Sequence, residues 1–118
     1  MINVGINQAS AVLRAPFSVF QTSREARDLM ESAMREVIRL SEKVQANLTE
    51  EDIKKFNDIL QGLNPEGKTS MLQDVEAGRK TEVEMFAGKV ISLGKKHNVP
   101  TPVNQRLFDL IKEIEAKY

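Results

Sequence analysis

Residues 23–46, SREARDLMESAMREVIRLSEKVQA, decide the fold class because their apolar side chains recur at steps of three and four residues. This period predicts an amphipathic helix with one face turned towards a core. The opposite face carries acidic and basic residues and is expected to be solvated. Thr22 and Glu25 have the spacing of a capping box, so we expect the helix to begin beside them.

The rest of the chain contains further helical segments and no alternating strand of useful length. A short helix is expected within residues 2–13, and residues 16–21 are expected to form a loop with apolar side chains tucked inward. Capping residues, or a proline at a first helical position, indicate further helix starts at residues 49–52, at Ser70, at Thr81 with Glu84, and at residues 101–102. The sequence therefore predicts one all-α domain over residues 1–118, a bundle of five to six helices.

Composition excludes several classes of function before any motif is considered. The 118 residues include 17 basic and 17 acidic side chains, so no net charge steers the chain towards nucleic acid or an anionic membrane. The chain has no cysteine, which excludes disulfides, thiolate chemistry and cysteine-ligated metal centres. The longest uncharged stretch, residues 1–13, is too short to span a bilayer and lacks the basic start of a signal peptide. A cytoplasmic protein is the expectation.

Residues 62–69, GLNPEGKT, match the phosphate-binding pattern G-x-x-x-x-G-K-S/T of nucleotide hydrolases. That loop needs a buried strand in front of it, whereas the residues before Gly62 have helical periodicity. A chance match in a turn is therefore the favoured interpretation. The glycines also lack the G-x-G-x-x-G spacing of the dinucleotide-binding turn, so this chain should not form that cofactor site by itself.

A few polar side chains are the remaining candidates for chemistry. Asn3 and Asn7 are four residues apart and share one helical face, where their amides either bond to loop backbone or bind a small polar ligand in a cleft. Ser70 stands where a helix begins and is either a simple N-cap or part of a carboxylate site. Glu82, in the first turn of the next helix, is by itself most simply a solvated acid. His97, the only histidine, is interpreted as a helix-end residue, and no metal site is expected.

Residues 69–84, TSMLQDVEAGRKTEVE, resemble the signature S/T-S-M-x-Q-D-x-x-x-x-R-x-T-E-I/V-D/E of the ketopantoate reductase C-terminal domain. Residues 3–11, NVGINQASA, resemble that family's N-x-x-I-N-P-L-S/T-A segment, and the match continues through residues 97–104, HNVPTPVN. The resemblance runs over essentially the whole chain with the family's order and spacing. It implies a fold like the C-terminal domain of 6-phosphogluconate dehydrogenase.

The resemblance also implies an activity. The family, 2-dehydropantoate 2-reductase, consists of NADPH-dependent oxidoreductases of pantothenate biosynthesis that reduce ketopantoate to pantoate. Their substrate cleft lies between an N-terminal Rossmann domain and a helical C-terminal domain, and residues 1–118 resemble only the helical half. The implied partners are a small 2-oxo acid, the Rossmann domain, and a second copy in a homodimer, with no nucleic acid and no membrane.

By this resemblance, several residues take the roles of family site residues. Asn3 and Asn7 match the two substrate-contacting asparagines, and Ser70 matches the serine that helps to hold the substrate. Glu82 matches the glutamate near the reacting centre and the cofactor, a supporting catalytic and cofactor-binding role. Other residues of the signature, Asp74 and Arg79, are expected to be structural and to pair across the bend at Gly78.

The chain departs from the family pattern at three places. The family's general-acid lysine lies four residues before the first asparagine, which counts back to two positions before Met1. Gln8 replaces the usual proline after Asn7, a change that we expect to matter little. Phe17 stands where some members carry a further substrate-contacting asparagine, which puts that contact in doubt.

The start of the chain, with Met1 directly before the motif, is interpreted as a cut at a domain boundary. We therefore expect an isolated helical domain that folds but has no reductase activity. A second class stays open, a non-catalytic helical dimerisation or interaction module that kept the fold. The joint presence of Asn3, Asn7, Ser70 and Glu82 disfavours this module, because packing alone needs none of these polar groups. The identity of the 2-oxo acid is less constrained than the fold, because relatives of this architecture reduce other 2-oxo acids.

Overall fold

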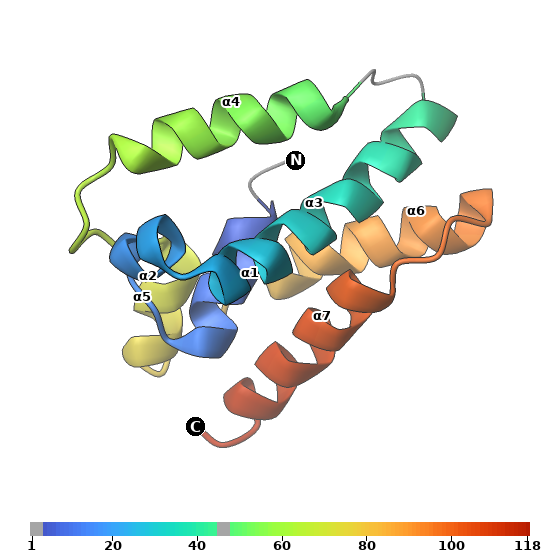
Figure 1. Ribbon diagram of the computed structural model, residues 1–118. Helices are drawn as coiled ribbons and strands as arrows, with labels where there is room; N and C mark the ends of the chain where they lie inside the picture. Colours follow the sequence, from blue (N-terminus) through green and yellow to red (C-terminus); the bar gives the residue numbers. More distant parts are fainter. Residues whose placement is uncertain (1–3, 45–47) are drawn as a thin grey trace.

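The structure, a computed structural model, describes residues 4–44 and 48–118, which form seven α-helices and one π-helical turn and contain no strand (Figure 1). In chain order the elements are α1 (Val4–Leu13), α2 (Phe17–Thr22), α3 (Arg24–Lys43), α4 (Glu50–Gln61), α5 (Ser70–Glu76), the π-helical turn η1 (Glu84–Gly88), α6 (Lys89–His97) and α7 (Pro102–Glu115). The predicted all-α fold is confirmed, although the described residues form more helices than the five to six expected.

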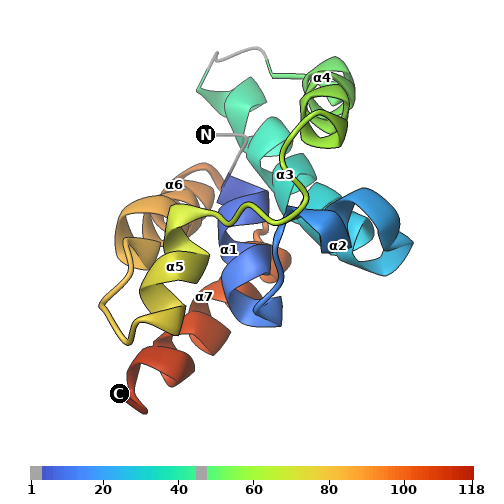
Figure 2. The same cartoon turned by 90° about the vertical axis from the view of Figure 1, so that its left-hand side faces the viewer.

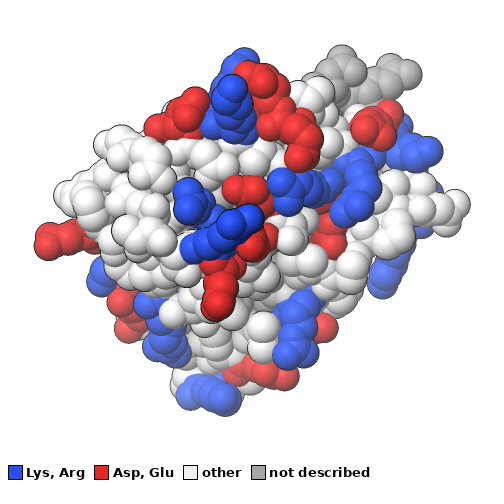
Figure 3. Space-filling view, in the orientation of Figure 1, with Lys and Arg blue, Asp and Glu red and all other residues white. Residues whose placement is uncertain are grey.

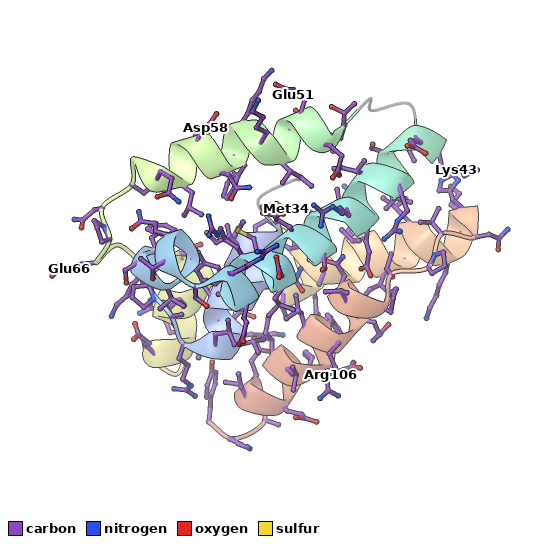
Figure 4. All side chains as sticks on the ribbon, in the orientation of Figure 1. Met34, Lys43, Glu51, Asp58, Glu66 and Arg106 are labelled. Carbon is purple, nitrogen blue, oxygen red and sulfur yellow. The ribbon has the colours of Figure 1, made fainter. Side chains whose placement is uncertain are left out.

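The apolar period of residues 23–46 produces α3, the longest of the described helices. Figure 1 shows α3 crossing the middle of the molecule, with α4 on one side of it and α7 on the other. Figure 4 shows Met34 on the inward face of α3, where it is fully buried. Lys43, at the end of α3, and Glu51 and Asp58, on α4, point outward. One face of α3 is therefore the surface on which the other helices pack.

The segment expected to be a loop, residues 16–21, instead lies mostly in the short helix α2, which continues to Thr22. The backbone N–H groups of Phe17 and Ser18 donate to the carbonyls of Gly67 and Pro65, each at 2.9 Å. The 62–69 segment thus satisfies donors that a helix start leaves free. A helix of six residues is also too short to show an apolar period, so the sequence carried no signal for it.

The cap of α3 differs by one residue from the predicted capping box. Ser23 is the N-cap, and its hydroxyl oxygen accepts a hydrogen bond from the Ala26 N–H at 3.3 Å. Thr22 belongs to α2, and its hydroxyl donates to the carbonyl of Ser18 at 2.9 Å. The predicted pair of Thr22 with Glu25 is therefore wrong, because Thr22 is occupied by the preceding helix.

Helix α1 runs through the interior and packs against α3, α5 and α7. Figure 2 shows it between α5 and α3. Its approach to α3 is close, because a Cβ atom added to Gly5 would lie 2.6 Å from the carbonyl oxygen of Met30. Ala9 belongs to the apolar cluster on the α2, α3 and α4 side, and Ala11 belongs to the cluster formed with α5, η1, α6 and α7. Helix α1 therefore joins the two main parts of the core.

Helix α7 begins at a buried carboxylate rather than at a local cap. Pro102 is its first residue as predicted, but the Thr101 side chain makes no capping hydrogen bond. Glu36 of α3 accepts from the Val103 N–H at 2.8 Å, from the Asn104 N–H at 2.9 Å and from the Asn104 side-chain amide at 2.7 Å. These bonds satisfy the first donors of the helix from a distant element.

The same network includes the residue that replaces the family's proline. The Gln8 side-chain amide donates to the side-chain oxygen of Asn104 at 3.0 Å, and both residues are fully buried. Gln8 thus ties α1 to α7 and, through Asn104, to Glu36 of α3. The expectation that Gln8 matters little is therefore wrong, since a buried hydrogen bond depends on its amide.

The molecular surface mixes charges of both signs. On the face shown in Figure 3, basic and acidic side chains are interspersed rather than gathered by sign. This distribution agrees with the equal numbers of basic and acidic residues in the sequence. Among the described residues, no helix is long and apolar enough to cross a membrane.

Candidate functional site

The candidate residues lie in or beside three different elements. Asn7 lies in α1 and is half-buried, Ser70 is the first residue of α5 and is exposed, and Glu82 is exposed just before η1. Asn3 lies outside the described residues. Within the described chain, the side chains of Asn7, Ser70 and Glu82 make no hydrogen bond or ion pair with another residue. Their polar groups are therefore free to bind water or a ligand.

Two buried hydroxyl groups link the turn of Asn7 to the start of α5. Ser10 Oγ donates to the Asn7 carbonyl at 3.0 Å and lies 2.6 Å from Thr69 Oγ1. Since Ser10 has one hydroxyl proton, the Thr69 hydroxyl is the donor between the two. The two residues are only 1% and 7% exposed, so water does not compete for these bonds. The structure thus brings the backbones of Asn7 and Ser70 to neighbouring places.

The helix start at Ser70 is confirmed, but its cap is the preceding residue. Thr69 Oγ1 accepts from the Leu72 N–H at 3.1 Å, which makes Thr69 the N-cap of α5. The interpretation of Ser70 as a simple N-cap is therefore wrong. Its exposed hydroxyl is not used in capping.

The backbone before Glu82 is held by a residue that the sequence analysis missed. Glu115 Oε2 accepts from the Thr81 N–H at 2.7 Å and from the Thr81 hydroxyl at 2.6 Å. The Thr81 hydroxyl oxygen accepts from the Val83 N–H at 3.2 Å. The predicted capping box of Thr81 with Glu84 is therefore wrong, because Glu115 takes the acceptor role expected of Glu84.

Electrostatic contacts surround the start of η1. Glu84 Oε1 accepts from Lys112 Nζ at 2.7 Å, and this hydrogen bond, together with the charge of Lys112, lowers the pKa of Glu84. The same hydrogen bond raises the pKa of Lys112, whose Nζ also lies 3.6 Å from Glu115 Oε1. Burial raises the pKa of Tyr118, with a smaller contribution from the charge of Glu115. Lys112, Glu115 and Tyr118 line a small hollow of about 340 Å³.

The remaining signature residues behave as expected. Arg79 Nε donates to Asp74 Oδ1 at 3.0 Å across Gly78, whose φ of 71° favours glycine. This confirms the predicted structural pair. In the hydrolase-like segment, residues 62–69, the preceding element is α4 rather than a strand, and Lys68 pairs with Glu76 at 2.9 Å. These contacts agree with a chance match to the phosphate-binding pattern.

Phe17, which stands where some family members carry a substrate-contacting asparagine, packs against a loop. Its N–H bonds to the Gly67 carbonyl, and a Cβ atom on Gly67 would lie 3.0 Å from the Phe17 ring. The half-buried ring therefore packs on the loop that leads to Ser70. In the described part of the chain, no three or more histidine, cysteine or acidic residues gather as metal ligands.

Residues 1–115 match the family model described as the ketopantoate reductase PanE/ApbA C terminal. This chain belongs to that family. The 2-dehydropantoate 2-reductase of Pyrobaculum aerophilum is 34% identical over 119 residues, which cover 98% of this chain and 41% of that protein. The similarity to ketopantoate reductases therefore extends over nearly the whole chain.

Solved structures show the same fold for this ketopantoate reductase domain. A dimeric ketopantoate reductase from Staphylococcus aureus superimposes with a TM-score of 0.90 at 24% identity, covering 98% of this chain and 40% of that chain. A D-mandelate dehydrogenase, in a ternary structure with NADH and anilino(oxo)acetate, gives a TM-score of 0.86 at 21% identity and covers 98% and 38%. The chain therefore spans about two fifths of the length of its relatives.

Membership of this family identifies which signals the sequence analysis overlooked. Ser10 and Thr69 occupy the S/T positions of the two ketopantoate reductase motifs, so a hydroxyl at each was visible in the pattern. Their contact was not visible, because 59 residues separate them. Glu115 lies outside both motifs, and nothing in its surroundings distinguished it from a solvated acid.

Proposed function

We propose that this domain is the substrate-binding half of a 2-dehydropantoate 2-reductase, which reduces ketopantoate to pantoate with NADPH held mainly by a Rossmann domain. The observation that carries the proposal is the family match over residues 1–115, which spans both motifs of candidate residues. The free polar groups of Asn7, Ser70 and Glu82 support it, because a substrate wall needs polar groups that the fold has not used. No observation of comparable weight favours a non-catalytic interaction module.

Each residue has a role suited to a 2-oxo acid. The amides of Asn3 and Asn7 hydrogen-bond the polar groups of the substrate, and the Ser70 hydroxyl helps to hold it. NADPH supplies the hydride, and the family's lysine, which precedes the first asparagine, supplies the proton to the developing alkoxide. Glu82 orients polar groups of substrate and cofactor near the reacting carbon.

The fit of this chain to NADPH is partial. The six glycines lie at positions 5, 62, 67, 78, 88 and 94, without the spacing that cradles a dinucleotide pyrophosphate. Glu82, which is exposed at the end of a loop, is the group that this chain offers to the cofactor. We accordingly propose an enzyme assembled from both domains, located in the cytoplasm and paired as a homodimer.

The experiment compares the isolated chain with a fused reductase, in which the Rossmann half of the Pyrobaculum aerophilum relative, including its lysine, precedes residue 1. We expect no NADPH oxidation with ketopantoate by the isolated chain and clear turnover by the fused reductase. Asn7→Ala, Ser70→Ala and Glu82→Gln should each lower kcat/KM of the fused reductase by about tenfold or more.

Matched controls separate binding from folding. Ser92→Ala and Glu113→Gln change exposed residues of the same types and should leave kcat/KM unchanged. A folded fused reductase that fails to oxidise NADPH with ketopantoate would contradict the proposed function. Turnover by the isolated chain would contradict the expectation that it is inactive alone.

A further inference from the structure

The exposed Glu82 lies between two buried neighbours. Thr81 is 6% exposed and belongs to the loop that follows α5, and Val83 is fully buried in the apolar cluster formed with α1, α5, η1, α6 and α7. The direction in which such a side chain projects is set by the backbone of its two neighbours. Whatever fixes Thr81 and Val83 therefore fixes the place from which the Glu82 carboxylate projects.

Glu115 holds Thr81 directly, and Thr81 in turn holds Val83. Its Oε2 accepts two hydrogen bonds from Thr81, at 2.7 Å from the N–H and 2.6 Å from the hydroxyl. Because the hydroxyl proton is used there, the hydroxyl oxygen is free to accept from the Val83 N–H at 3.2 Å. Hydrogen bonds to a carboxylate are about twice as strong as neutral ones, and the Glu115 side chain is only 9% exposed.

Little else holds this backbone. The Arg79 N–H donates to the Asp74 carbonyl at 2.8 Å, and this is the last backbone hydrogen bond at the C-terminal end of α5. Among residues 80–82 of the described chain, the Thr81 amide alone donates a hydrogen bond, and its acceptor is Glu115. The Glu82 carbonyl also accepts from the Phe86 N–H of η1 at 3.0 Å, which holds the far side of the segment. Without the bond to Glu115, the backbone before Glu82 would therefore lose its one donated hydrogen bond.

The position of Glu115 is not explained by the stability of its own helix. It is the last residue of α7, where the carbonyl ends of a helix repel a negative charge. Lys112, one turn earlier, lies 3.6 Å from the Glu115 carboxylate and offsets part of that repulsion. The acid instead matches the two donors of Thr81, which lie 34 residues away in sequence.

We propose that Glu115 is a positioning residue for the reaction, because it holds Thr81, whose hydroxyl in turn holds the Val83 N–H, and so sets where the Glu82 carboxylate stands in the substrate cleft. This inference rests on the proposed function for the role of Glu82. The positioning itself is a property of this chain and can be measured without substrate.

The first measurement uses the isolated 118-residue chain. Backbone relaxation and amide exchange by NMR should show Thr81 and Glu82 ordered in the parent and loosened in Glu115→Ala, with the helices unchanged. Glu113→Ala removes an exposed acid from the same helix and should change neither. Unchanged order at Thr81 and Glu82 in Glu115→Ala would overturn the proposal.

The second measurement is a double-mutant cycle in the fused reductase. Glu115→Ala should lower kcat/KM by up to about 100-fold, the scale of a small misplacement of a group at the site. In a Glu82→Ala background it should cause no further loss, because its effect passes through Glu82. Glu115→Gln keeps an acceptor oxygen and should retain more activity than Glu115→Ala.

The outcomes separate the two proposals. An equal loss of kcat/KM in both backgrounds would mean that Glu115 supports the fold rather than Glu82, and would overturn the inference. Loosening of Glu82 with unchanged kcat/KM would overturn it as well. An inactive fused parent would count against the proposed function, while the NMR comparison still decides whether Glu115 positions Glu82.

Discussion

At the scale of single residues, Glu36 is the most heavily bonded buried acid in the described chain. It is 1% exposed and accepts three hydrogen bonds from the start of α7. Hydrogen bonds to charged groups contribute more than neutral ones, and unpaired buried donors are costly. The start of α7 therefore depends on a side chain of α3.

We expect Glu36→Ala to lower the free energy of unfolding by about 3 kcal/mol or more, because it leaves the backbone N–H groups of Val103 and Asn104 without an acceptor. Urea denaturation followed by circular dichroism measures the loss. Glu42→Ala, an exposed acid on the same helix, should change it by less than about 0.5 kcal/mol. Equal effects of the two substitutions would show that the network contributes nothing.

A second residue-scale prediction concerns the pH dependence of Glu84. Lys112 lowers the pKa of Glu84, so the pair stabilises the fold at neutral pH, and that contribution is lost as the pH falls through the lowered pKa. Lys112→Met should raise the pKa of Glu84 towards its ordinary value. NMR titration of the Glu84 side-chain carboxyl carbon tests this, and a pKa that does not move would refute the assigned cause.

Residue-scale contacts could be predicted from the sequence only where both partners are local. The helix start at residues 49–52 forms a capping box, since Thr49 and Asp52 lie within one helical turn. The boxes expected at Thr22 and Thr81 do not form, because a preceding helix occupies Thr22 and Glu115 binds Thr81 from a distant helix. Spacing along the chain carries no information about such competitors.

At the scale of elements, the packing of α1 on α3 depends on a missing side chain. Gly5→Ala should lower the free energy of unfolding by about 1–3 kcal/mol, because its Cβ atom would lie 2.6 Å from the Met30 carbonyl oxygen. Gly62→Ala is the matched control, since the nearest atom to its Cβ would be 3.5 Å away. Thermal unfolding of both variants provides the comparison, and a Gly5→Ala variant as stable as the control would contradict the close approach.

The start of α3 gives another element-scale prediction. Ser23→Ala should cost about 1 kcal/mol of stability, because it removes the acceptor for the Ala26 N–H. Thr22→Ala removes only an exposed bond to Ser18 within α2 and should cost less. Chemical denaturation measures the stability of both variants. A larger loss of stability for Thr22→Ala than for Ser23→Ala would favour the capping box of Thr22 with Glu25 that the sequence predicted.

Elements were predictable where they are long enough to be periodic. Helix α3 follows from its apolar spacing, whereas α2 depends on acceptors in the 62–69 segment that no local pattern reveals. A helix start was expected at Thr81 with Glu84, but the π-helical form of the turn η1 had no sequence signal. Short elements are thus decided by their tertiary surroundings.

At the scale of the whole molecule, α1 makes one cooperative unit of the two main apolar clusters, because Ala9 belongs to one and Ala11 to the other. We expect a single unfolding transition. Tryptophan introduced at Phe56 and, separately, at Phe108 reports on each cluster, and the two urea midpoints should agree with those measured by circular dichroism on each variant. A separate transition at lower urea concentration at either tryptophan would contradict the expectation that the two clusters unfold together.

The sequence as a whole predicted the fold, but it did not reveal the surroundings of the candidate residues. The two motifs named Asn7, Ser70 and Glu82, and the structure describes where their backbones lie. The buried partners that hold those backbones, Ser10 and Glu115, had to be found from contacts between distant segments. Physical proximity in the fold, rather than order in the chain, determines them.

Ser70 and Glu82 are exposed, and each directly follows a buried threonine. A buried residue that holds the fold is therefore followed by an exposed polar residue at both places. In evolution, the exposed residue of such a pair can be substituted while the buried threonine before it is kept. Under the proposed function, such an exchange changes the polar groups offered to the substrate and leaves the interior intact. The folding free energy would then change little while the substrate preference changes.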